Sequence, residues 1–436
     1  MSPFYLKEGL KLGVSSAATQ IEGGDRNNSW YDWYLKGHIK GGSDPSRACD
    51  HYARFREDAL LMSSMGIGNY RMGIEWSRIE PEEGVFSKEV LSHYREEIVL
   101  LRSRGIEVLL TLHHFTNPMW FENMGGFGNP RAEEIFLRFT AEVIHSIGDL
   151  VSEYITINEP NVYAVSSYFY GAWPPGVKSF RSTMRIYKAM TACHIRAYQL
   201  IHRIRREMGF TDTRVGVANH IRIFEPASRF NPWHILCARL MDLLFQSALT
   251  KAMSLGRPAF PIGRCKGIRP GKYYDFIGVN YYSRTTVSGF ADGVRKNAPV
   301  NDLGWEIYPE GIVRACQMLF DRYHAQIYIT ENGTCDNDDS FRARYIYEHL
   351  KALCESRLPV ARYYHWCFTD NFEWLEGESA RFGLVHVDYD TQERTVKRSG
   401  EFYSRMIREK GVSRELLKEY ATQRYKTNSP DAEDRR

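Results

Sequence analysis

Short runs in which apolar or β-branched residues alternate with other residues recur along the chain and predict strands. Eight such runs are present, and most precede a segment long enough for a helix. The predicted strands are residues 13–20, 69–76, 107–114, 154–158, 214–220, 275–282, 326–330 and 362–368. The segments with helical spacing are residues 55–65, 90–104, 132–147, 182–208, 233–252, 311–323 and 341–356.

Strands that alternate with helices are typical of parallel strands joined by right-handed crossovers. Eight such units indicate an α/β protein with a single closed (β/α)8 barrel, the TIM barrel, rather than an open sheet. We expect one catalytic domain over residues 1–425 and a disordered polar tail over residues 426–436. Long connections at residues 21–51, 161–182 and 283–309 should lie at the carboxyl-end face of the strands.

One predicted strand, Tyr154 to Asn158, ends on Glu159 and Pro160. Because proline cannot donate to a sheet ladder, the strand stops there and Glu159 should sit at its carboxyl end. A second stretch repeats this pattern, since the strand over residues 326–330 is followed by Glu331. In a barrel these two carboxyl groups could face each other across one mouth.

Other predicted strands also end on polar or aromatic residues. These are Gln20, Arg71, His113 with His114, Asn280 with Tyr282, and Trp366 followed by Glu373 and Trp374. Taken singly, each has a plainer explanation, because a lone Glu after a strand is usually a solvated loop charge and a lone Arg a surface residue. Barrel closure would instead bring all of them round one mouth. Adjacent histidines face opposite sides of a strand, and no HExxH or Cys/His array is present, so no metal site is expected.

Composition narrows the possible functions. The 436 residues are 43% hydrophobic and 25% charged, which is ordinary for a globular protein with a large core. The net charge is only +4, with Lys and Arg scattered among Asp and Glu, so a nucleic-acid partner is not indicated. Aromatic residues reach 14%, which fits either a large core or a flat ligand such as a sugar.

The cellular location is predicted from the N-terminal residues, the lengths of the apolar runs and the cysteines. Residues 1–12 lack a long apolar run and contain Lys7 and Glu8, so we expect no signal peptide. No stretch approaches 18 apolar residues, and no membrane span is expected. Eight dispersed cysteines without a CxxC pair suggest reduced thiols and a cytoplasmic enzyme. Nothing in the sequence indicates the oligomeric state.

Two glutamates, an arginine and many aromatics suit glycoside hydrolysis, which needs one carboxyl protonated and the other ionised. An arginine beside one glutamate would lower its pKa and hold it as an anion, while a drier aromatic setting would raise the pKa of the other. Asn158, next to Glu159, could bond a sugar 2-hydroxyl.

Seven stretches in order resemble glycoside hydrolase family 1, the β-glucosidase-type retaining enzymes, over about residues 13–406. They are residues 20–23, 70–78, 156–160 (Thr-Ile-Asn-Glu-Pro), 304–311, 329–333 (Ile-Thr-Glu-Asn-Gly), 370–374 and 381–384. The resemblance implies that Glu159 is the acid/base and Glu331 the nucleophile, with carboxyls about 5–5.5 Å apart. It implies that Arg71 and Tyr282 contact the nucleophile and that no cofactor is needed.

The same resemblance implies a substrate-binding set. These residues are Gln20, His114, Trp120, Asn158, Asn280, Trp305, Trp366, Glu373, Trp374 and Phe382. Trp366 would form the floor beneath the sugar ring, Trp120 would line the same pocket, and Trp305 would touch the aglycone. The partners would be small-molecule β-glycosides or short oligosaccharides.

The resemblance also bears on the substrate. The phospho-sugar branch of the family has a serine in place of Glu373-Trp374. A carboxylate at this position would repel a 6-phosphate, so the resemblance favours an unphosphorylated substrate and an exo-β-glucosidase. Glu378 stands where an aromatic is common, and Thr116-Asn117-Pro118 stands where many members have an acidic residue, so glucose, galactose, fucose and mannose stay open. A transglycosidase using the same residues is an alternative. A non-catalytic glycoside-binding barrel is disfavoured, because both glutamates are present.

Overall fold

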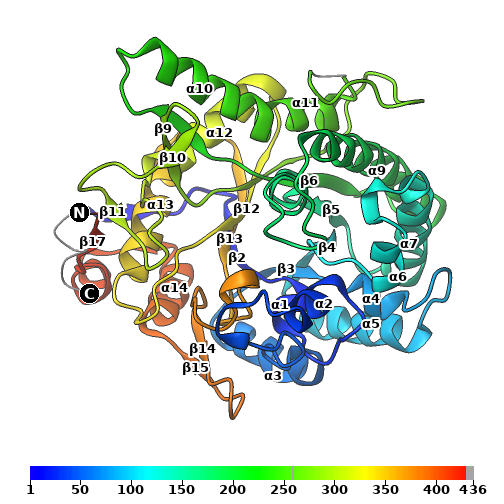
Figure 1. Ribbon diagram of the computed structural model, residues 1–436. Helices are drawn as coiled ribbons and strands as arrows, with labels where there is room; N and C mark the ends of the chain where they lie inside the picture. The colour runs from blue at the N-terminus through cyan, green and yellow to red at the C-terminus, as the bar shows by residue number, and fades with distance from the viewer. Residues whose placement is uncertain (258–259, 429–436) are drawn as a thin grey trace.

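The computed structural model describes residues 1–257 and 260–428 of the chain. Eight parallel strands close into a barrel in the order β12-β13-β2-β3-β4-β5-β6-β8 (Figure 1). They are β2 (Lys11–Ser15), β3 (Asn69–Gly73), β4 (Glu107–His113), β5 (Glu153–Asn158), β6 (Arg214–His220), β8 (Ile277–Asn280), β12 (Ile327–Asn332) and β13 (Val360–Trp366). The predicted (β/α)8 barrel is confirmed, and each predicted strand contributes one barrel strand.

Helices surround the barrel, and each segment with helical spacing contains one (Figure 1). The longer helices are α3 (His51–Ser64), α5 (Lys88–Ser103), α7 (Ala132–Ile147), α9 (Phe180–Glu207), α10 (Pro232–Asp242), α11 (Ala248–Leu255), α12 (Glu310–Tyr323), α13 (Arg342–Glu355) and α14 (Arg398–Glu409). A π-helical turn, η4 (Leu243–Ser247), separates α10 from α11 inside the segment predicted as one helix.

Helix α7 illustrates why these segments are helical. Its apolar residues Ile135, Phe139 and Val143 recur at a spacing of four and are fully buried. Two glutamates occupy its first turn, where negative charge complements the positive end of the helix dipole. The buried stripe packs against α9 and α5 and covers the outside of the barrel.

The first barrel strand begins and ends earlier than predicted. Strand β2 stops at Ser15, and Gln20 lies in a short buried helix, α1 (Ala18–Ile21), rather than at a strand end. The expected strand over residues 13–20 is therefore wrong in its second half. The small residues Ser15 to Ala18 carry little strand preference, so tertiary packing decides the conformation there.

Several elements outside the barrel were not predicted. The strands are β1 (Phe4–Tyr5) with β16 (Gly411–Val412), β7 (Ile223–Pro226) with β9 (Arg284–Ser288) and β10 (Ala291–Gly293), β14 (Val385–Val387) with β15 (Arg394–Val396), and β11 (Pro299–Val300) with β17 (Lys426–Thr427). The short helices are α2 (Ser29–Leu35), η1 (Lys40–Gly42), α4 (Trp76–Ile79), α6 (Met119–Asn123), η2 (Gly126–Gly128), α8 (Pro160–Ala164), η3 (Val165–Phe169), η5 (Trp374–Glu376) and α15 (Arg414–Tyr420).

The start of the predicted tail belongs to one of these pairs. Lys426 and Thr427 pair with Val300 and Pro299, so the polar end of the chain is held at its first residues rather than loose from Lys426 onward. Residues 429–436 of the predicted tail lie outside the described residues.

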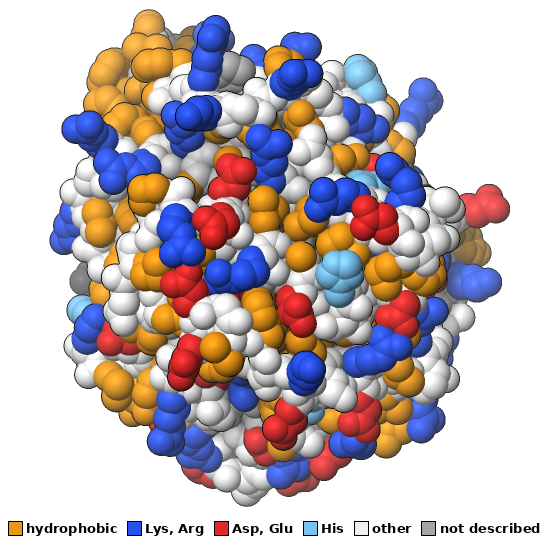
Figure 2. All heavy atoms as spheres, turned by 90° about the vertical axis from the view of Figure 1, so that its right-hand side faces the viewer, with side chains coloured by type: hydrophobic (Ala, Val, Ile, Leu, Met, Phe, Trp, Pro, Cys, Tyr) orange, Lys and Arg blue, Asp and Glu red, His pale blue; other side chains and the backbone are white. Residues whose placement is uncertain are grey.

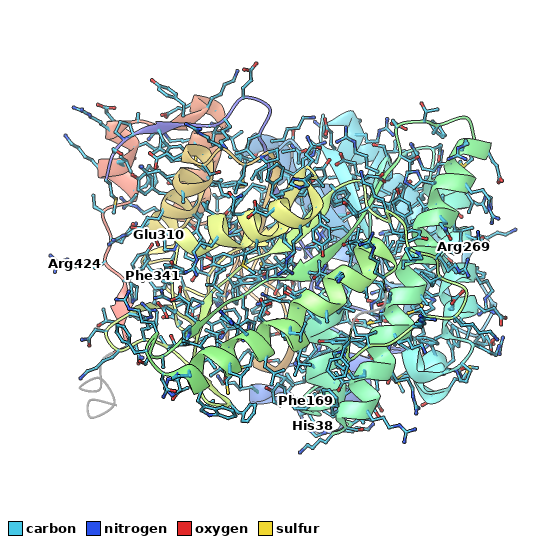
Figure 3. The ribbon with its side chains drawn as sticks, turned by 90° about the horizontal axis from the view of Figure 1, so that it is seen from above. His38, Phe169, Arg269, Glu310, Phe341 and Arg424 are labelled. Carbon is cyan, nitrogen blue, oxygen red and sulfur yellow. The ribbon has the colours of Figure 1, made fainter. Side chains whose placement is uncertain are left out.

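The connections that follow β2 and β5 lie together at one edge of the molecule. His38 and Phe169, one from each connection, are neighbours at the same edge in Figure 3. Trp30 and Trp173 join the two connections, with ring centroids 5.3 Å apart. Because both connections leave the carboxyl ends of their strands, this edge marks the mouth of the barrel.

On the face shown in Figure 2, Lys and Arg side chains are intermingled with Asp and Glu in the middle and lower parts, whereas Lys and Arg predominate in the upper part. Over residues 1–257 and 260–428, none of the helices combines the length and the apolar character needed to cross a membrane.

Candidate active site

Glu159 occupies a sharp turn between β5 and α8. Its backbone lies in the left-handed region, with φ 39° and ψ 57°, which residues other than glycine rarely adopt. The turn is held because the Glu159 N–H donates to the Ala218 carbonyl at 2.7 Å and Pro160 opens α8. Neighbouring residues of a strand normally face opposite sides, and this turn lets both Asn158 and Glu159 enter the same network at the mouth.

Glu331 is aimed by an irregularity at the end of β12. The pairing register between β12 and β8 shifts between Ile329 and Glu331, so that Glu331 lies opposite Asn280. Such a bulge re-aims a side chain next to an active site. Gly333 follows two residues later, and a Cβ there would stand 1.9 Å from the Trp366 carbonyl oxygen. The glycine thus permits close approach of the last two barrel strands below the mouth.

Arg71, fully buried on β3, contacts Glu331 directly. Its Nη1 donates to Glu331 Oε1 and to the Thr330 carbonyl, and its Nη2 donates to Asn158 Oδ1 at 2.6 Å. The Tyr282 hydroxyl donates to the other oxygen, Glu331 Oε2, at 2.6 Å. Both oxygens of Glu331 therefore accept from a neighbour, as expected for a carboxylate held in its ionised form.

Asn280 joins the first glutamate to this network. Its Nδ2 lies 3.0 Å from Asn158 Oδ1 and 2.9 Å from Glu159 Oε1. His220 Nδ1 reaches the same Oε1 of Glu159 at 3.1 Å. Predicted residues on or directly after β3, β5, β8 and β12 thus form one continuous chain of hydrogen bonds from Glu331 to Glu159.

The pKa of Glu331 departs from the direction that the sequence predicts. Burial raises the pKa of Glu331 to about 7; the Arg71 guanidinium opposes this rise, and the charge of Glu159 adds to it. The net pKa of Glu331 is thus raised, although Arg71 itself lowers it as predicted. Arg71 acts as foreseen, but removing the carboxyl from water outweighs it.

Both glutamates line a cavity of about 310 Å³ with a largely aromatic wall. Of the predicted residues, the cavity wall contains His114, Glu159, Tyr282, Trp305, Glu331, Trp366, Glu373, Trp374 and Phe382. The rings of His114 and Trp366 are stacked at 5.8 Å, and Trp374 packs on His114 from another side at 5.9 Å. Trp305 is 38% exposed and lies against Tyr282 and Phe382 towards the entrance.

Glu373 is a second polar group of the cavity wall, and the buried Gln20 contacts it from behind that wall. Gln20 Nε2 donates to Glu373 Oε2 at 3.2 Å and to the Phe372 carbonyl at 2.8 Å. Burial raises the pKa of Glu373 to about 8, with Glu331 adding to the rise and hydrogen bonds from Trp366 and Gln20 opposing it. Gln20 is thus placed as a support for Glu373 although its secondary structure differs from the prediction.

Two residues lie elsewhere than expected. The Trp120 indole N–H donates to the Glu80 carbonyl at 2.7 Å and its ring meets Trp76 edge-on, so Trp120 is not part of the cavity wall. Glu378 also lies outside that wall; burial raises its pKa, and Arg47 and Arg381 are the nearest opposing charges. The role of Trp120 in sugar binding therefore stays a prediction, and so does the effect of Glu378 on the choice of sugar.

Sequence reasoning missed nine residues of the cavity wall, which are Phe115, Val162, Ser166, Trp173, His220, Arg222, Leu303, Leu375 and Glu376. Phe115 follows His114 directly and packs on Trp374 at 5.2 Å. His220 is the last residue of β6, the same strand-end position that singled out the other site residues. That signal was available for His220, whereas nothing in the sequence marks Arg222.

Within the described part of the chain, no three His, Cys, Asp or Glu side chains are grouped so that they could hold a metal ion. The charged groups of the cavity are instead tied to one another by the hydrogen bonds described above.

A closed barrel whose strand ends join two buried carboxyl groups above an aromatic cavity defines a glycosidase-type barrel enzyme. Residues 4–412 match the sequence profile of glycosyl hydrolase family 1. Beta-glucosidase A of Thermotoga maritima is 32% identical over 446 residues, covering 93% of this chain and 98% of that protein. The chain belongs to glycosyl hydrolase family 1 and is a glycoside hydrolase.

Solved structures agree with this assignment. A beta-glycosidase from Pyrococcus horikoshii is similar with a TM-score of 0.86 at 34% identity, covering 96% of this chain and 98% of that one. A beta-glucosidase from Thermotoga maritima in complex with glucoimidazole has a TM-score of 0.85 at 30% identity, covering 94% of this chain and all of that one. The resemblance seen in the sequence is thereby confirmed at the level of the family.

Proposed function

We propose that the protein is a retaining exo-β-glycosidase that removes the terminal, unphosphorylated β-D-glycosyl residue, with β-glucosides as preferred substrates. The observation that carries this proposal is the single hydrogen-bond network from Glu331 through Arg71, Asn158 and Asn280 to Glu159. This network holds two carboxyl groups in one cavity, and the hydrogen-bond partners of their oxygen atoms differ.

The difference lies in how their oxygens are occupied. Glu331 accepts on both oxygens, from Arg71 and from Tyr282. Glu159 accepts twice on Oε1, while its Oε2 has no hydrogen-bond partner in the described chain. A proton shared by the coupled pair is accommodated on Glu159 Oε2 without losing a donor, whereas on Glu331 it would displace one. Glu159 is therefore the acid and Glu331 the anion.

The reaction then proceeds in two displacements. The Glu331 carboxylate attacks the anomeric carbon while Glu159 gives its proton to the departing glycosidic oxygen, forming a covalent glycosyl-enzyme. Glu159, now ionised, takes a proton from water, which attacks the anomeric carbon and releases Glu331. Two inversions restore the β configuration of the sugar.

The remaining cavity residues bind the sugar. Glu373, supported by Gln20, offers a carboxyl to sugar hydroxyls, and the stacked rings of His114 and Trp366 provide a flat surface for the ring. The exposed Trp305 lies on the side of the leaving group. A cavity of about 310 Å³ matches one sugar with its linkage rather than a long polysaccharide. The eight cysteines are free thiols, which favours the reducing cytoplasm.

The test is a panel of nitrophenyl β-glycosides (glucoside, galactoside, fucoside and mannoside), with the anomer of the first-formed sugar followed by NMR. We expect the highest kcat/KM for the glucoside and a β product formed first. Faster turnover of another glycoside would correct the sugar assignment. An α product would overturn the retaining mechanism, and product formed only with an added alcohol acceptor would identify a transglycosidase. Absence of turnover on every glycoside of the panel would instead favour the non-catalytic glycoside-binding barrel.

A further inference from the structure

A third pair of residues, His220 and Arg222, lies next to Glu159 in the wall of the cavity. His220 closes β6, and Arg222 follows two residues later, just before β7. Arg222 Nε donates to His220 Nε2 at 3.1 Å, and His220 Nδ1 lies 3.1 Å from Glu159 Oε1. The three side chains form a line that ends on the proposed acid.

We propose that Arg222 is a positioning residue that fixes the tautomer of His220 and thereby keeps the acid proton of Glu159 on the oxygen that faces the substrate. The inference rests on the proposed function and adds a role to two residues of the same site.

The chemistry of the donors carries the argument. A guanidinium has only donors, so His220 Nε2 must accept from Arg222. A neutral imidazole has one N–H, which is then on Nδ1 and donates to Glu159 Oε1. Asn280 Nδ2 donates to the same Oε1 at 2.9 Å. With Oε1 accepting from two donors, the proton of the carboxylic acid is left to Oε2.

The opposite tautomer would reverse this arrangement. If His220 carried its proton on Nε2, its bare Nδ1 would face Glu159 Oε1 and accept the carboxylic proton there. The proton would then point into the protein rather than towards the glycosidic oxygen. Arg222 excludes this tautomer, because its N–H and the Nε2–H would meet donor against donor.

Hydrogen bonds from neighbouring side chains fix the backbone of both residues. Asn161 Nδ2 donates to the His220 carbonyl at 2.7 Å and its Oδ1 accepts from the His220 N–H at 3.3 Å. Gln246 clamps Arg222 in the same way, accepting from its N–H at 2.9 Å and donating to its carbonyl at 3.0 Å. Two amide side chains thus fix the backbone of each member of the pair.

The ring contacts agree with a fixed orientation. The His220 ring stacks on Tyr282 at 5.7 Å and meets Phe245 edge-on at 6.0 Å. The Arg222 guanidinium lies over the same Phe245 ring at 5.5 Å. Arg222 makes no ion pair with a carboxylate of the described chain, although the charges of Asp292 and Glu159 act on it from a greater distance. Among residues 1–257 and 260–428, its one side-chain hydrogen bond goes to His220.

The test compares Arg222→Met, which removes the donor, with Arg222→Lys, which keeps one. Both are assayed on aryl β-glucosides of similar size whose phenol leaving groups range from acidic dinitrophenol to weakly acidic methylphenol. We expect Arg222→Met to lower kcat/KM for the methylphenyl glucoside by about 10–100-fold, part of the contribution of a general acid. The dinitrophenyl glucoside, which leaves without protonation, should be nearly unaffected, and Arg222→Lys should restore much of the loss.

A double substitution tests whether Arg222 acts through His220. In His220→Asn the amide nitrogen takes the place of Nδ1 and donates to Glu159 whatever stands at position 222. Adding Arg222→Met to this variant should therefore cause no further loss on the methylphenyl glucoside. An undiminished further loss would overturn the proposal, as would an equal loss on both glucosides in the single variant. Inactivity of the wild-type protein on every glucoside would instead contradict the proposed function.

Discussion

Replacing Tyr282 with phenylalanine isolates one hydrogen bond to the proposed nucleophile. The hydroxyl donates to Glu331 Oε2 at 2.6 Å, and burial raises the pKa of Tyr282 well above its usual range, so the donor persists at any assay pH. The substitution keeps the ring, which stacks on His220 and meets Trp305 edge-on at 5.9 Å. The change therefore removes a donor from the Glu331 carboxylate with little change in packing.

The magnitude follows from the ionised acceptor. A hydrogen bond to a charged group contributes about 1.5–3 kcal/mol. One pH unit in a pKa corresponds to about 1.4 kcal/mol, so the pKa of Glu331 should rise by about 1–2 pH units from its value near 7. Glu331 must be ionised to attack, so the acidic limb of the pH profile should move upward by that amount. Below that limb, kcat/KM should fall by about 10–100-fold.

The assay is the pH dependence of kcat/KM for a nitrophenyl β-glucoside in the wild type, in Tyr282→Phe and in a matched control. Tyr281→Phe serves as the control, because that hydroxyl donates to the Tyr308 carbonyl at 2.7 Å and does not contact Glu331. The control should keep the acidic limb of the wild type. An unchanged limb in Tyr282→Phe, or the same movement in both variants, would refute the reasoning.

Three further changes address other parts of the structure. Glu373→Gln should raise KM for the glucoside. The wild type should cleave a 6-phosphoglucoside at least about 100-fold more slowly, because burying a phosphate in a cavity that holds the Glu331 carboxylate costs several kcal/mol; equal rates in a direct comparison would contradict this. Trp120→Phe should lower the melting temperature through loss of its bond to Glu80 while leaving kcat/KM unchanged, so a large kinetic effect would place Trp120 in the site after all. His51 lies between two buried carboxylates, and its pKa is raised to about 10. Its contribution to the free energy of unfolding should therefore be complete below pH 6.5 and lost as the pH rises through about 10. Denaturant titrations of wild type and His51→Gln at pH 6 and 10 should therefore converge at the higher pH.

The barrel and its central pair could be read from the sequence for a physical reason. Strands buried in a barrel must be apolar, so a glutamate at their carboxyl ends stands out against its surroundings. Glu159 and Glu331 were found this way, and Pro160 marked the end of one strand. The same rule applied to β6 would have found His220, so that omission was avoidable.

Other features depend on geometry that no local pattern contains. Whether Trp120 or Phe115 enters the cavity is decided by the path of the turn after β4, where Phe115 has a φ of 68°. The pKa of Glu331 depends on how completely the folded chain removes it from water, which outweighs the charge of Arg71. Arg222 acquires its place only because Gln246, from a later π-helical turn, clamps its backbone. These results come from tertiary packing.

The most direct test of the central claim is the product formed by Glu331→Gly in the presence of azide. Glycine removes the nucleophile and leaves space for azide below the anomeric carbon, while Glu159 remains to protonate the leaving group. The account predicts that hydrolysis is lost and that azide restores turnover as an α-glycosyl azide, with one inversion seen by NMR. A β-glycosyl azide from this variant would mean that the roles of Glu159 and Glu331 are exchanged.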